Sequence, residues 1–138
     1  MPSTYETRYS AGMSRQRVLL LETDTVLESV LCDMFADEDL DVSRCGSLAE
    51  LRTLVSQYPR AAVVSDSWTP GEYQTLSAQH RAEIQALSEV AEVVLTTGAD
   101  WARHIRRGEL GTVEIVEKPY TMDQLLVAVR TALARASV

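Results

Sequence analysis

The stretch Val63-Val64-Ser65-Asp66-Ser67-Trp68-Thr69-Pro70-Gly71 contains the feature around which the chain is organised. A short apolar run ends at a single carboxylate, and a turn closed by Pro and Gly follows at once. The apolar run predicts a buried strand, and the Pro-Gly pair predicts the loop that leaves it. Asp66 is therefore expected at the carboxyl end of a strand, which is the edge of an open α/β sheet where ligands bind.

The composition indicates one globular domain. With 138 residues the chain can bury roughly two-thirds of its unfolded surface in one core. No apolar run approaches the roughly 20 residues that span a bilayer, and the N-terminus does not resemble a secretory signal. The net charge of −7 argues against general nucleic-acid binding by this domain alone. Cys32 and Cys45 have neither metal-ligand spacing nor a disulfide framework, so we expect reduced thiols in a cytoplasmic protein that does not contact a membrane.

Strands and helices alternate along the chain. Apolar or alternating runs predict strands at 18–21, 40–44, 61–65, 93–95 and 112–116. Apolar residues at helical spacing predict helices at about 26–35, 47–56, 72–88, 100–107 and 121–133. Thr23 or Asp24 is expected to cap the first helix, and capping boxes at 47–50 and 121–124 open the second and the last. Residues 1–15 show no periodicity and are expected to be a flexible tail before a domain at 16–138.

The strand patterns also predict the order of the strands. Strands that alternate with helices make a doubly wound parallel α/β sheet, here a (βα)5 unit. The runs at 18–21, 61–65 and 93–95 are continuously apolar, as in strands covered on both faces, whereas 40–44 and 112–116 alternate, as at a sheet edge. With right-handed crossovers this predicts the order 2-1-3-4-5. The ends of strands one and three then meet, which brings Glu22 beside Asp66.

Four polar residues are expected at this edge of the sheet: Glu22, Asp66, Thr96 and Lys118, the only lysine beside twelve arginines. Paired carboxylates suit Mg²⁺, which takes oxygen ligands. A cation and a lysine neutralise a transferring phosphoryl group, and a carboxylate between them can be its acceptor. No glycine-rich loop follows the first strand, so a small flavodoxin-like enzyme or a nucleotide binder is disfavoured. Neither histidine falls at a strand end, which disfavours a His-based triad.

This combination resembles the receiver domain of two-component response regulators, a flavodoxin-like three-layer sandwich, over about residues 17–136. The resemblance rests on Glu22, Asp66 with its Thr69-Pro70-Gly71 loop, Thr96 and the pair Lys118-Pro119. It implies that Asp66 accepts a phosphoryl group from a histidine kinase or phosphotransfer protein. It implies that Glu22, Asp66 and the Trp68 backbone carbonyl hold Mg²⁺. It further implies that Thr96 bonds the phosphoryl oxygen, that Lys118 pairs with Asp66 or its phosphate, and that the Lys118–Pro119 peptide is cis.

The chain departs from the family's pattern at several positions. Thr23 stands where the family has a second acid, so Mg²⁺ is expected to bind more weakly, and Thr23 itself is interpreted as a helix cap rather than a metal ligand. Asp24 is expected to serve the first turn of the helix. Ile115, at the family's aromatic switch position, has no polar tip. Thr97 stands where the family favours a smaller residue, and Trp68 is bulky beside Asp66, so both are expected to narrow the access of a phosphodonor and of water to Asp66.

We therefore expect a single-domain receiver, not an enzyme acting on a free substrate, that signals by changing its protein contacts. The expected partners are a kinase or phosphotransfer protein and an output protein or second copy. The resemblance places the output contact on the helix at 100–107 and the last strand-helix pair. The cationic residues of that helix are explained equally well without a partner, because cations near the carboxyl end of a helix interact favourably with its dipole. The runner-up is a degenerate receiver that binds partners without phosphorylation, which Thr23 and Ile115 favour.

Overall fold

The computed structural model describes residues 15–66, 78–98 and 113–137. Within them lie five strands: β1 (Arg17–Leu21), β2 (Asp41–Arg44), β3 (Ala62–Asp66), β4 (Glu92–Thr97) and β5 (Glu114–Glu117). The described helices are α2 (Thr25–Asp37), α3 (Leu48–Gln57), α4 (Ala78–Ser88) and α6 (Met122–Ala136). The largest differences from the predicted bounds are in β4, which is three residues longer, in α6, which ends three residues later, and in β5, which begins two residues later than predicted. The predicted helix at 100–107 lies outside the described residues, as does the start of the helix predicted at 72–88.

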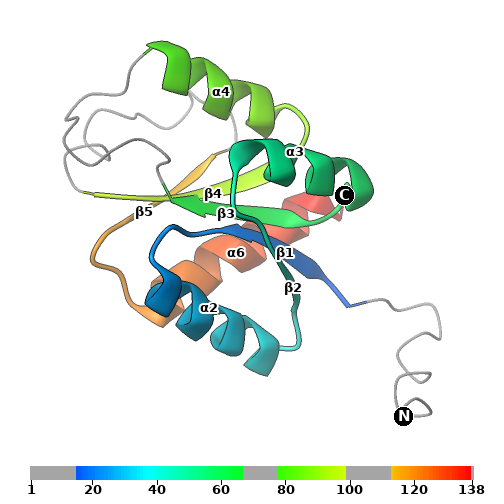
Figure 1. Cartoon of the computed structure of the whole chain (residues 1–138). Coiled ribbons are helices and arrows are strands. Elements are labelled where there is room, and N and C mark those ends of the chain that lie inside the picture. Colours follow the sequence, from blue (N-terminus) through cyan, green and yellow to red (C-terminus); the bar gives the residue numbers. More distant parts are fainter. Residues whose placement is uncertain (1–14, 67–77, 99–112, 138) are drawn as a thin grey trace.

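The strands form one parallel sheet in the order β2-β1-β3-β4-β5, as predicted. Helices α2 and α6 cover one face, and α3 and α4 cover the other, so the molecule has three layers (Figure 1). The central strands β1 and β3 are buried along nearly their whole length, whereas β2 and β5 lie at the two edges and are only partly buried. The difference between continuous and alternating apolar runs therefore predicted the position of each strand correctly.

The core is divided by the sheet into two clusters. On β1, Leu19 and Leu21 pack under α3 and α4, while Val18 and Leu20 pack under α2 and α6. The alternation follows from the pleat, since successive side chains of a strand point to opposite faces. Both cysteines are free, and Cys45 lies in the first of these clusters. No helix in the described part of the chain has the length and apolar character needed to cross a bilayer.

Side chains of the expected type cap α3 and α6. Thr121 accepts the N–H of Gln124, whose side chain accepts the N–H of Thr121, so the predicted capping box of α6 is confirmed. The box predicted for α3 is only half formed. Ser47 accepts the N–H of Glu50, but the Glu50 carboxylate accepts the N–H of Gly46 instead of Ser47. The Glu50 carboxylate therefore fixes the backbone at Gly46, one residue before the N-cap.

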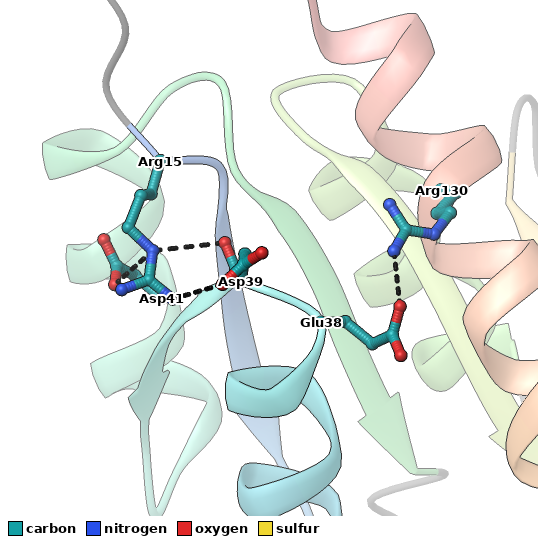
Figure 2. Close-up of polar contacts among 5 residues, drawn as sticks. All are labelled: Arg15, Glu38, Asp39, Asp41 and Arg130. Carbon is teal, nitrogen blue, oxygen red and sulfur yellow. Dashed lines mark hydrogen bonds and ion pairs between the residues drawn. The ribbon is translucent and has the colours of Figure 1, made fainter. Parts of the chain in front are cut away.

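The turn between α2 and β2 is held by polar contacts from distant parts of the chain (Figure 2). Asp39 has φ of 62°, in the left-handed region that few residues other than Gly, Asn and Asp adopt. Arg15 donates to the carbonyl of Asp39 and pairs with Asp41 at 3.6 Å. Glu38 accepts from Arg130 of α6 at 2.8 Å. Because these ion pairs are solvent-exposed, each contributes at most about 1 kcal/mol, and their main effect is to position the turn.

Candidate functional site

Three polar residues lie at the carboxyl edge of the sheet, each at or just beyond the end of a buried strand. Glu22, Asp66 and Thr96 each come two residues after a strand residue that packs under α2 and α6. Because the side-chain period of a strand is two, Asp66 and Thr96 are directed to that same face. Glu22, one residue beyond β1, lies beside Asp66. Asp66 and Thr96 are also direct partners in the β3–β4 register. The structure therefore brings together residues that are up to 74 positions apart in the sequence.

Asp66 is buried, with 3% of its surface exposed, and its two carboxylate oxygens differ. Oδ2 accepts the N–H of Thr23 at 3.0 Å and the Thr23 hydroxyl at 2.6 Å. Oδ1 is buried and has no hydrogen-bond partner among the described residues. A buried carboxylate oxygen left without a partner is costly. A donor or cation bound to Oδ1 would therefore remove this cost.

Glu22 lies beside Asp66 and is 7% exposed. Its Oε2 accepts the N–H of Asp24 at 3.1 Å. Burial, above all, raises the pKa of the Glu22 carboxyl above its ordinary value of 4.5, and the neighbouring Asp66 raises it further. The Asp24 N–H and the charge of Lys118 act in the opposite direction. Two carboxylates held this close disfavour each other's charge, which a cation between them would relieve.

Lys118 follows β5 at the same edge. Its N–H donates to the carbonyl of Thr97 at 2.7 Å, which anchors the start of the loop to β4. The Lys118–Pro119 peptide is cis, as the resemblance implied. The lysine charge lowers the pKa of Glu22, so the ammonium group acts on the Glu22 carboxylate. The hydroxyls of Thr96 and Thr97 are buried at the end of β4 without a hydrogen-bond partner in the described chain.

Tyr120 is a member of this region that the sequence analysis did not single out. Its hydroxyl is buried and has no partner among the residues described. Burial raises the pKa of Tyr120 to about 12, with smaller contributions from Glu22 and Asp66, so the hydroxyl lies within the field of both carboxylates. The sequence feature that could have indicated this residue is a tyrosine two positions after the single lysine, Lys118.

The interpretation of Thr23 as a helix cap was wrong. Asp24 is the N-cap of α2, and its side chain accepts the N–H groups of Val26 and Leu27. Thr23, one residue earlier, directs its hydroxyl to Asp66 instead. The expectation that Asp24 serves the helix is thereby confirmed. Ile115 is partly buried and packs against the cluster under α3 and α4.

The described donors suit a hard divalent cation only in part. Glu22 and Asp66 provide carboxylate oxygens, and Mg²⁺ is often held by one or two carboxylates together with waters. Among the described residues, no group of three acidic, histidine or cysteine side chains is placed to hold a metal. Trp68, whose backbone carbonyl was a predicted ligand, lies outside the described residues. The unpartnered Oδ1 and the raised pKa of Glu22 fit a cation at this edge.

Comparison with known proteins reveals similar sequences and folds. No protein-family model matches the chain. The aerobic respiration control protein ArcA of Escherichia coli K12 is 27% identical over 123 residues, which are 89% of this chain and 50% of ArcA. The chain thus spans about half the length of the curated relatives it matches.

Solved structures share the fold. The receiver domain of the TMAO respiratory system response regulator TorR superimposes with a TM-score of 0.68 at 25% identity, covering 88% of this chain and 98% of that one. A response regulator receiver domain protein from Clostridium thermocellum has a TM-score of 0.69 at 18% identity, covering 88% and 97%. The similarity to ArcA, the likeness to the TorR receiver and the 2-1-3-4-5 sheet together identify the chain as a response regulator receiver domain.

Proposed function

We propose that Asp66 accepts a phosphoryl group from a phosphohistidine of a kinase or phosphotransfer protein. The observation that carries the proposal is the buried Oδ1 of Asp66, which has no partner among the described residues and lies beside Glu22, a carboxylate on which the Lys118 charge acts. A carboxylate oxygen attacks the phosphorus, a P–O bond forms, and the P–N bond breaks with its electron pair left on the imidazole, which takes a proton from solvent. The product is an aspartyl phosphate.

The other residues of this edge orient and neutralise the phosphoryl group. The Lys118 ammonium pairs with its negative charge, and the Thr96 hydroxyl, which has no partner in the described chain, donates to one of its oxygens. Glu22, Asp66 and the Trp68 carbonyl would hold Mg²⁺, which when bound supplies further neutralising charge. We infer weak Mg²⁺ binding, because a neutral hydroxyl at Thr23 replaces an acid and already bonds Asp66.

The output is a change in protein contacts, not turnover of a free substrate. The β5–α6 side of the molecule carries a groove of about 470 Å³ that includes Ile115 and the exposed Val127. Exposed apolar side chains beside a groove suit a protein partner. We propose this side, with the segment at 100–107, as the contact for an output protein or a second copy of the chain, in the cytoplasm, away from nucleic acid and membrane.

Intact-mass measurement after incubation with acetyl phosphate and Mg²⁺ tests the phosphoryl transfer. We expect the mass of one phosphoryl group to be added to the wild type and not to Asp66→Asn, which keeps the size of the side chain. Asp123→Asn, at an exposed carboxylate in the first turn of α6, is the matched control and should be labelled as well as the wild type. An unlabelled wild type with every divalent metal tried would overturn the proposal.

A degenerate receiver remains the second candidate, and one observation favours it. Thr23 occupies Oδ2 of Asp66 with two hydrogen bonds, so the carboxylate is partly satisfied without a metal or phosphate. In that case the affinity for the output partner is the same in three samples: the wild type, the wild type treated with acetyl phosphate, and Asp66→Asn. If phosphorylation controls the output, acetyl phosphate changes the binding of the wild type and leaves that of Asp66→Asn unaltered.

A further inference from the structure

Residue 23 holds one oxygen of Asp66 through two donors. The Thr23 N–H and hydroxyl both point to Oδ2, at 3.0 and 2.6 Å, while Oδ1 has no partner among the described residues. A hydroxyl-to-carboxylate distance of 2.6 Å is in the range of charge-assisted hydrogen bonds, which are the stronger kind. One residue thus distinguishes two chemically equivalent oxygens.

The backbone on both sides of Thr23 is fixed. The preceding residue, Glu22, accepts the N–H of the following residue, Asp24. Asp24 in turn caps α2 through the N–H groups of Val26 and Leu27. The Thr23 donors are therefore held in place by the folded loop before any ligand arrives. Although Asp66 is buried, Thr23 is exposed, so its hydroxyl can rotate toward water without crossing the core.

We propose that Thr23 is the positioning residue of Asp66: its hydroxyl holds Oδ2 in place of a metal-bound acid and leaves Oδ1 as the phosphoryl-accepting oxygen. A divalent cation that needs Oδ2 must displace this hydroxyl, so the same bond orients Asp66 and weakens cation binding. This inference deepens the proposed phosphoryl transfer and rests on it for the role of Oδ1. The bond itself is measurable without phosphorylation.

A double-mutant cycle in EDTA measures the bond. Unfolding equilibrium constants are determined for the wild type, Thr23→Val, Asp66→Ala and the double variant. Valine keeps the branched shape of threonine without the hydroxyl. We expect the effects to deviate from multiplicative behaviour by about tenfold or more, as for a hydrogen bond to a charged group. Thr23→Ser retains the donor and should keep most of this coupling. A coupling factor near one overturns the proposal.

Calorimetric titration with Mg²⁺ tests the competition. Because valine leaves Oδ2 without the hydroxyl, Thr23→Val is expected to bind Mg²⁺ with a Kd about tenfold lower than the wild type, and Thr23→Ser with an unchanged Kd. An equal or weaker affinity in Thr23→Val refutes the competition. Strong coupling in the cycle with no phosphoryl adduct would overturn the proposed transfer and support positioning by Thr23. A phosphoryl adduct together with a coupling factor near one would support the proposed transfer and overturn positioning by Thr23.

Discussion

At the scale of single residues, the carboxyl edge of the sheet carries an electrostatic cost in the metal-free protein. Burial and Asp66 raise the pKa of Glu22 above 4.5. The folded protein therefore binds a proton at Glu22 more tightly than the unfolded chain does. The contribution of Glu22 to stability must fall as the pH rises from about 4.5 through the raised pKa, and it remains lower at neutral pH.

Glu22→Gln removes this penalty and retains an oxygen to accept the Asp24 N–H. In EDTA we expect the variant to unfold at higher urea concentration than the wild type at pH 7, with an advantage that shrinks as the pH falls toward 4.5. Glu89→Gln, at an exposed carboxylate beyond the end of α4, serves as the control and should stay within about 0.5 kcal/mol of the wild type at both pH values. An advantage of Glu22→Gln that is equal at both pH values would exclude titration of Glu22 as its cause.

Tyr120 carries a buried hydroxyl without a partner in the described chain. Tyr120→Phe removes only that hydroxyl, so the free energy of unfolding should rise by about 1 kcal/mol as an unsatisfied polar group disappears. Tyr58→Phe is the matched control, because Tyr58 is partly exposed and stacks its ring on Arg17 at 4.2 Å, a contact that phenylalanine can retain. A loss of stability in Tyr120→Phe, measured by urea denaturation, would mean that the hydroxyl has a partner in solution.

At the scale of the elements, helix α6 depends on its capping box. Thr121→Ala leaves the Gln124 N–H without its acceptor and should lower the free energy of unfolding by about 1 kcal/mol. Thr53→Ala, at an exposed position within α3, is the control and should be neutral or stabilising by up to about 0.5 kcal/mol, since alanine is the better helix former. Equal effects of the two substitutions in thermal denaturation would contradict a specific contribution from the cap.

At the scale of the whole molecule, stability depends on the cluster between the sheet and the helices α2 and α6. Leu125 is fully buried there, and Leu125→Ala is expected to cost about 2–5 kcal/mol, a large part of the roughly 5–15 kcal/mol available to a domain. Val127 lies on the same helix with 66% of its surface exposed, so Val127→Ala should change the stability by less than about 0.5 kcal/mol. Chemical denaturation compares them, and similar losses in both would contradict the assignment of the core.

The predictions from sequence were most accurate where the physical signal is local. The period of each apolar run decided which strands lie inside the sheet, and the side chains of Ser47 and Thr121 decided where two helices begin. The positions of Glu22, Asp66 and Lys118 at the carboxyl ends of their strands were also readable, because parallel strands end at one edge. The assignment of Thr23 failed, since a hydroxyl beside a helix start suits a cap equally well by sequence alone.

The sequence by itself determined the layered α/β architecture, the strand order and the edge at which the polar residues gather. Only the tertiary structure decided which atom bonds which: the Thr23 hydroxyl reaches an oxygen 43 residues away, and the Tyr120 hydroxyl is buried near two carboxylates at the ends of β1 and β3. Backbone periodicity acts over a few residues and is readable from the chain. Hydrogen bonds and desolvation act over a few ångströms in space, and folding alone creates that proximity.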